Sequence, residues 1–227
     1  MPSPSLPRTT RQVDTAPSVD AAVLWLHGLG ADGSDFEPIV PLLPLPDTAR
    51  IRFLFPNAPV RPITINGGMA MPGWFDLYQL GPGREDSEGI IASGEQMAAM
   101  IQALRDQGID SRRIVVAGFS QGGVVALQAG LRYEAPLAGI LAMSTWLARA
   151  GSLARERHEA NRETPVLMLH GDRDEMVDVA LARRGAEHLQ ALGQPVQFKT
   201  WPMGHEVCPP EIEMIGHWLA KVLPPLP

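Results

Sequence analysis

The chain has 227 residues, of which 45% are hydrophobic and 19% are charged, and its formal net charge is −6. This composition excludes an intrinsically disordered chain, and the charges form no basic stripe of the kind that binds nucleic acid or an anionic membrane surface. The length fits one α/β domain with a sizeable core.

The single cysteine, Cys208, excludes an intrachain disulfide and favours a reducing, cytoplasmic compartment. Residues 1–19 are rich in Pro, Ser and Thr and contain no apolar run. We therefore expect a flexible N-terminal arm there and a single domain over residues 20–227. No apolar run is long enough to cross a bilayer, so we expect no stable membrane insertion. We expect a monomer or a homodimer.

Apolar runs that end in Gly, Pro or polar residues alternate along the chain with segments of helical periodicity. The predicted strands are, in order, residues 21–26, 51–55, 114–116, 137–143, 166–169 and 196–200. The predicted helices are residues 87–107, 124–131, 179–192 and 210–222, with a further helix within 146–164. This alternation predicts an α/β fold with a mostly parallel central sheet and helices on both faces.

The predicted strand that starts at Ile114 runs into Gly118-Phe119-Ser120-Gln121-Gly122, a match to G-x-S-x-G. A helix is predicted directly after it, and strand, sharp turn and helix are the context in which this motif presents a nucleophilic serine. Gly118 and Gly122 would let strand and helix pass closely. Ser120 would also lie at a helix N-terminus, which favours negative charge. We therefore predict that Ser120 is a nucleophile.

The serine needs a base, and the base needs an acid to orient it. His205 lies in a loop after the last predicted strand, with Gly204 before it, and fits the expected order of serine, acid and histidine. The other histidines lie in helical patterns, in a polar segment or at strand ends before glycines. For the acid we favour Asp174, which lies further out on its loop than Asp172, and Asp172 remains the alternative.

An oxyanion hole would need two backbone N–H groups. One comes from Gln121, the residue after the nucleophile, and the other from the glycine-rich loop after the first predicted strand, where we nominate Leu29. Gly28, Gly30 and Gly33 in that loop also match G-x-G-x-x-G, so a dinucleotide-binding protein is the alternative from a different class. Turn-forming residues after Gly33 and the missing acidic residue at the end of the second strand speak against it.

Several segments together resemble the phospholipase/carboxylesterase family of α/β-hydrolases, which includes bacterial carboxylesterases and acyl-protein thioesterases. They are Leu26-His27-Gly28-Leu29-Gly30-Ala31-Asp32, Pro72-Gly73-Trp74-Phe75-Asp76, Gly118-Phe119-Ser120-Gln121-Gly122-Gly123, His170-Gly171-Asp172-Arg173-Asp174 and Met203-Gly204-His205-Glu206. The resemblance implies an α/β-hydrolase fold without a lid domain. It also implies a triad of Ser120, Asp174 and His205, the two oxyanion donors named above, and no metal or other cofactor.

The resemblance further implies that the loop carrying Trp74 lines the acyl side of the cleft. The apolar residues that would form this wall are Met69, Met71, Trp74, Leu77, Met176 and Val177. Residues 61–83, rich in Gly and Pro, are expected to be a fixed wall and not a lid. We therefore predict a serine carboxylesterase for small, short-to-medium acyl esters, with acyl-protein thioesterase or lysophospholipase activity as the alternative.

Overall fold

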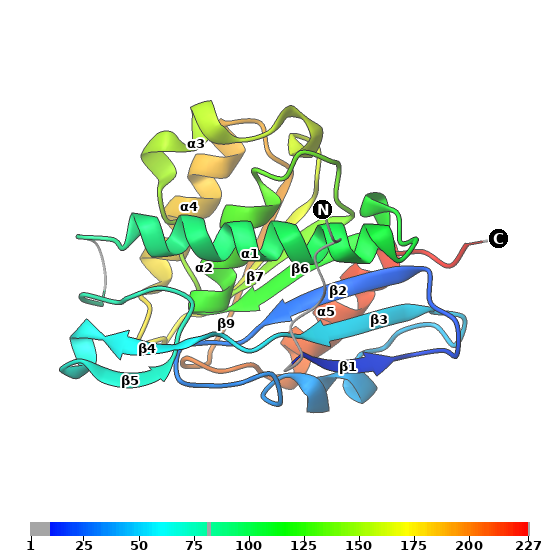
Figure 1. Ribbon diagram of the computed structural model, residues 1–227, viewed down its shortest axis with the longest axis horizontal. Coiled ribbons are helices and arrows are strands. Elements are labelled where there is room, and N and C mark those ends of the chain that lie inside the picture. Colours follow the sequence, from blue (N-terminus) through cyan, green and yellow to red (C-terminus); the bar gives the residue numbers. More distant parts are fainter. Residues whose placement is uncertain (1–9, 81–82, 227) are drawn as a thin grey trace.

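A computed structural model describes residues 10–80 and 83–226. In that part of the chain a seven-stranded sheet has the order β1-β3-β2-β6-β7-β8-β9 (Figure 1). The strands are β1 (Arg11–Asp14), β2 (Ala21–Leu26), β3 (Ile51–Phe55), β6 (Ile114–Phe119), β7 (Gly139–Met143), β8 (Val166–Gly171) and β9 (Val196–Trp201). All neighbours pair in parallel except β1, which pairs antiparallel with β3. The predicted fold class is confirmed.

Both faces of the sheet are covered by helices, because its inner strands are apolar on both sides. In β2, Ala22, Leu24 and Leu26 pack into one core cluster, and Ala21, Val23 and Trp25 pack into the other. The helices of the first cluster are α1 (Ser87–Asp106), α2 (Gln121–Gly130), α3 (Ala150–Glu156) and α4 (Val179–Ala191). The second cluster contains α5 (Pro209–Val222) and a short 3₁₀ helix, Glu37–Leu42. Figure 1 shows α5 behind the sheet, opposite α1.

The predicted flexible arm is wrong for Arg11–Asp14, which form the edge strand β1. Backbone pairing with β3 holds this strand, in a register that places Arg11 opposite Phe55. Its side chains are mostly exposed and show no apolar alternation, so the sequence carried no strand pattern. Ion pairs from Arg11 to Glu37 and from Arg52 to Asp14 add to the backbone pairing. Residues 1–9 of the predicted arm lie outside the described residues.

The long segment after β3 forms a small ribbon of two antiparallel strands, β4 (Val60–Ile63) and β5 (Met69–Pro72), joined by the 3₁₀ turn Thr64–Asn66. The ribbon extends from one end of the main sheet (Figure 1). The Thr64 N–H donates to Asp76 Oδ1 at 2.7 Å, and the Ile65 N–H donates to the Leu77 carbonyl at 2.8 Å. These bonds join the ribbon to the segment that follows it. That residues 61–83 form a fixed wall stays a prediction.

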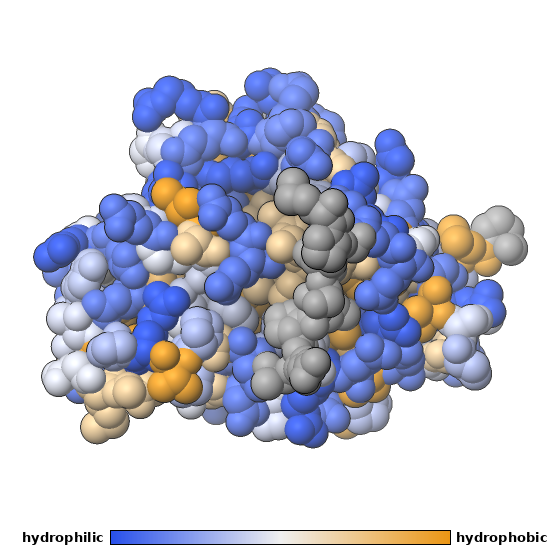
Figure 2. Space-filling model, viewed as in Figure 1, coloured by the Kyte–Doolittle hydropathy of each residue, from blue (hydrophilic) through white to orange (hydrophobic). Residues whose placement is uncertain are grey.

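Hydrophilic residues predominate on the face in Figure 2, where strongly hydrophobic residues are scattered. None of the helices in the described part of the chain combines the length and the apolar character that a membrane span requires. Most other predicted strands and helices agree with the structure to within a few residues. The first two predicted strands, residues 21–26 and 51–55, have the bounds of β2 and β3.

Candidate active site

Ser120 lies in the turn between β6 and α2, with φ 54° and ψ −120°. This backbone conformation is rare for a residue with a side chain and costs about 1–3 kcal/mol. Close contacts on both sides require glycine, because a Cβ at Gly118 would lie 2.1 Å from the Gly122 carbonyl oxygen. A Cβ at Gly122 would in turn lie 2.3 Å from the Leu26 carbonyl oxygen. The turn thus holds Ser120 at the carboxyl edge of the sheet, as the sequence predicts.

The His205 imidazole faces a buried carboxylate, since its Nδ1 lies 2.7 Å from Asp174 Oδ2. The other carboxylate oxygen, Oδ1, accepts hydrogen bonds from the N–H groups of Met176 and Val177 at 2.9 and 2.8 Å. Burial would raise the pKa of Asp174, but hydrogen bonds from His170, His205 and the Val177 N–H hold that pKa well below its ordinary value. Asp174 is therefore an anion at neutral pH and orients His205.

The alternative acid, Asp172, points away from this pair. Its side chain is 48% exposed and lies 3.9 Å from Arg173 Nε, and its backbone N–H donates to the Trp201 carbonyl. Of the two aspartates considered from the sequence, Asp174 is the one that contacts the imidazole.

The two predicted oxyanion donors line the same cavity as Ser120. In the described part of the chain, neither the Leu29 N–H nor the Gln121 N–H donates to an acceptor, so both are available to a ligand. The loop of Leu29 is held by the Gly30 N–H, which donates to the Pro72 carbonyl at 2.8 Å, and Gly30 has a left-handed φ of 78°. The Gln121 side chain is buried, where its Oε1 accepts from the Trp74 N–H and its Nε2 donates to the Phe75 carbonyl.

Ser120 and His205 both line a cavity of about 340 Å³. Four of the predicted wall residues line it: Met71, Leu77, Met176 and Val177. Met69 is 64% exposed on β5 and does not line this cavity. Much of the lining is apolar, which suits an acyl chain next to the two predicted oxyanion donors.

The prediction that Trp74 faces the cleft is wrong. Its side chain is 1% exposed, and it does not line the cavity that contains Ser120. The indole Nε1–H donates to the His27 carbonyl at 2.8 Å, and the backbone N–H donates to Gln121 Oε1 at 3.0 Å. Burial of the large ring, with its N–H hydrogen-bonded, is more stable than exposure of the ring in the cleft. Trp74 therefore packs behind the residues that line the cavity.

Trp146 takes the wall position that the sequence analysis gave to Trp74. It follows β7 at the same carboxyl edge of the sheet and lines the cavity together with Phe119 and Leu181. Its ring meets Phe75 edge to face, with the centroids 6.2 Å apart. The position of Trp146 just after a strand was the signal that could have identified it, because sites in parallel sheets form at the carboxyl ends of strands.

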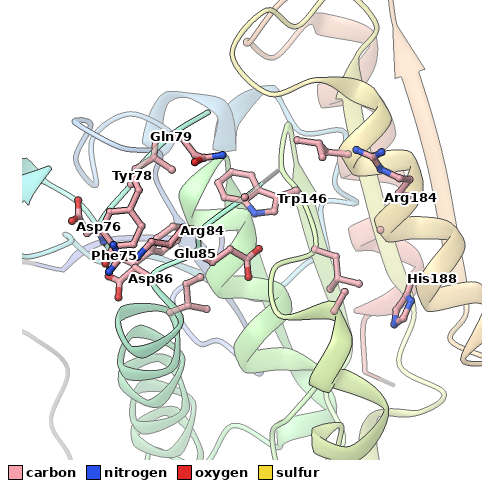
Figure 3. A pocket seen from close by; sticks show the side chains of 17 residues that line it. Phe75, Asp76, Tyr78, Gln79, Arg84, Glu85, Asp86, Trp146, Arg184 and His188 are labelled. Atoms are coloured by element: carbon pink, nitrogen blue, oxygen red, sulfur yellow. Dashed lines mark hydrogen bonds between the residues drawn. The ribbon is translucent and has the colours of Figure 1, made fainter. Parts of the chain in front are cut away.

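A second cavity of about 390 Å³ adjoins the first and shares Leu77, Gln79, Trp146 and Leu181 with it. Figure 3 shows Trp146 between residues of the 75–86 segment on one side and Arg184 and His188 of α4 on the other. Trp146 thus separates an apolar cavity at the serine from a more polar one.

The dinucleotide alternative does not fit the structure. The glycine loop opens no α-helix, because residues 27–36 form turns and the next element is the 3₁₀ helix at Glu37. A Cβ at Gly33 would lie 2.4 Å from the Phe55 carbonyl oxygen, so this glycine serves packing against β3. Among the described residues, no group of three or more His, Cys, Asp or Glu side chains could hold a metal ion.

Comparison with known proteins shows the family of this chain. The family model described as Phospholipase/Carboxylesterase matches residues 12–223. The chain belongs to this family. Acyl-protein thioesterase 1 of Gibberella zeae is 41% identical to it, over 90% of this chain and 92% of that protein. Acyl-protein thioesterase 1 of Mycosarcoma maydis is 37% identical, over 90% of this chain and 92% of that protein.

Solved structures of the family have the same fold. The crystal structure of Arabidopsis thaliana SOBER1 is similar with a TM-score of 0.85 and 30% identity, over 89% of this chain and 99% of that one. The crystal structure of Zea mays acyl-protein thioesterase 2 is similar with a TM-score of 0.83 and 29% identity, over 94% of this chain and 98% of that one. This member of the phospholipase/carboxylesterase family is therefore a serine hydrolase that acts on ester bonds.

Proposed function

We propose that this protein hydrolyses acyl thioesters, in the manner of an acyl-protein thioesterase, and also cleaves oxygen esters of the same acyl groups. The observation that carries the proposal is the pairing of His205 Nδ1 with Asp174 Oδ2 at 2.7 Å, in the apolar cavity that also contains Ser120. The names of the two fungal relatives favour a thioester substrate over the short-to-medium ester that we favour from the sequence.

In the first half of the reaction, His205 takes the proton of Ser120 while the hydroxyl oxygen attacks the acyl carbonyl carbon. Asp174 holds the imidazole in the tautomer that has its hydrogen on Nδ1, and stabilises the imidazolium that forms. The developing oxyanion accepts hydrogen bonds from the Leu29 and Gln121 N–H groups, each worth about 3–4 kcal/mol.

In the second half, the thiol or alcohol leaves with the proton from His205, and the acyl group stays on Ser120. Water then gives a proton to His205 and attacks the acyl carbonyl carbon. The bond to Ser120 breaks, His205 returns the proton to the Ser120 oxygen, and the carboxylic acid is released. Thioesters and oxygen esters with the same acyl group place their oxyanion at the same donors and give the same acyl-enzyme, so one site serves both.

The test compares two substrates that carry the same acyl group, an S-acyl cysteine peptide and an O-acyl serine peptide. We expect kcat/KM to be higher for the thioester, and expect Ser120→Ala to lower both rates by several orders of magnitude while the protein stays folded. Activity of the Ser120→Ala protein at the wild-type level would contradict the assignment of the nucleophile. A higher kcat/KM for the oxygen ester would contradict the thioesterase proposal and favour a carboxylesterase.

A further inference from the structure

His170 lies at the end of β8, directly before Gly171, and its side chain is fully buried. The ring reaches the catalytic loop from beneath, since its Nε2 lies 2.8 Å from the Val177 carbonyl oxygen and 3.4 Å from Asp174 Oδ2. The same Oδ2 atom is the one that His205 Nδ1 approaches at 2.7 Å. The Asp174 carboxylate thus has a histidine nitrogen on two sides.

These contacts determine which ring nitrogen of His170 donates a hydrogen bond. Its Nε2 faces a carbonyl oxygen and a carboxylate oxygen, which both only accept hydrogen bonds, so Nε2 must carry the hydrogen. Nδ1 is buried and has no hydrogen-bond partner within residues 10–80 and 83–226. His170 therefore presents an Nε2–H group to the Val177 carbonyl and to Asp174 Oδ2.

We infer that His170 is a positioning residue of the triad, which fixes Asp174 and limits the negative charge that this carboxylate presents to His205. The inference rests on the proposed function of the Ser120 site. Val177 closes the arrangement, because its N–H donates to Asp174 Oδ1 at 2.8 Å while its carbonyl accepts from His170. The turn from Asp174 to Val177 is held at both ends, and the plane of the carboxylate is fixed with it.

The charge effect follows from the shared oxygen. In the described part of the chain, the ionisable side chain that His170 contacts is Asp174. His205 contacts the same oxygen of that carboxylate, so the two histidines are linked through it. A donor at Oδ2 stabilises the carboxylate and weakens its pull on the hydrogen of His205 Nδ1. Without that donor, the carboxylate would favour the imidazolium form of His205 more strongly. The base would then become available only at higher pH.

The experiment compares two substitutions. His170→Leu removes the donor, while His170→Gln keeps an N–H donor near the position of Nε2. For His170→Leu we expect kcat to fall by about 10- to 100-fold, the range known for residues that orient metal-bound side chains, with KM changed by less than about twofold. We also expect the acidic limb of the kcat/KM profile to move to higher pH by about half a unit. His170→Gln should restore most of kcat and the wild-type limb.

A merely structural role would lower the melting temperature without moving the acidic limb, and that result would overturn the inference. Equal behaviour of the Leu and Gln variants would overturn it too. If the Leu variant does not fold, ¹⁵N NMR of histidine in the wild-type protein decides instead. We expect the spectrum to show a hydrogen on His170 Nε2 at pH 7, and an Nε2 without a hydrogen would refute the inference. Full activity of Ser120→Ala would instead refute the proposed function, whatever the His170 variants do.

Discussion

Replacement of Asp174 by Asn tests the orientation of the base most directly. The amide oxygen can keep the hydrogen bonds that Oδ1 accepts from the Met176 and Val177 N–H groups, at 2.9 and 2.8 Å. The amide NH₂ then takes the place of Oδ2 and faces His205 Nδ1 at the 2.7 Å position. Two donors cannot share that contact, so the imidazole must move its hydrogen to Nε2.

With its hydrogen on Nε2, His205 cannot accept the proton of Ser120. We expect kcat to fall by about 10⁴-fold, as for other serine triads with the wrong tautomer, which corresponds to about 5 kcal/mol of transition-state stabilisation. The assay is steady-state hydrolysis of an acyl thioester at pH 7, with the melting temperature measured to verify folding. Asp172→Asn is the matched control, because that side chain is 48% exposed and does not contact His205. A loss of less than tenfold for Asp174→Asn, or a larger loss for Asp172→Asn, would refute this reasoning.

Three further predictions concern packing, specificity and pH. Gly122→Ala should prevent stable folding, because its Cβ would lie 2.3 Å from the Leu26 carbonyl oxygen. In the control, Gly151→Ala, the new Cβ would have no atom within 4 Å, so this variant should fold normally. Circular dichroism and melting curves compare the two variants. Trp146→Ala should join the two cavities. The ratio of kcat/KM for long acyl chains to that for short ones should then rise by roughly tenfold, within the range for altered pocket contacts. An unchanged ratio over a chain-length series would contradict this prediction. Burial raises the pKa of Glu211 to about 8 from its ordinary value of 4.5, so the protonated form is favoured in the folded state and stability falls as the pH rises from 4.5 towards 8. Glu211→Gln should therefore raise the melting temperature more at pH 8 than at pH 5, and an equal effect at both would argue against this burial penalty.

The parts of the site that depend on local backbone geometry could be predicted from the sequence. The Ser120 turn follows from a buried strand, two glycines and a helix, and each of these leaves a pattern in neighbouring residues. The strands β2 and β3 are short apolar runs, and their bounds in the structure are those of the runs. His205 and Asp174 follow strand ends, where parallel sheets gather their functional residues.

The features that depend on packing between distant segments could not be predicted in this way. Trp74 and Trp146 both follow strands. Trp74 is buried and donates to the His27 carbonyl, whereas Trp146 lines the cavity, and only the packing distinguishes them. The contact of His170 with Asp174 depends on how the loop after β8 folds back, which no periodicity records. The strand β1 is held by backbone pairing, which leaves no mark on its polar side chains.

The edge strand β1 has a practical consequence for anyone who shortens the chain. A protein that started at residue 20 would lack β1 and would leave the backbone N–H and C=O groups of β3 along that edge without partners. β3 carries Phe53, Leu54 and Phe55 in its five residues, and an uncovered apolar edge of this kind pairs readily with other chains. Removal of the first 19 residues as a dispensable tail should therefore produce aggregation during expression, whereas shortened chains that keep Arg11–Asp14 should remain monodisperse.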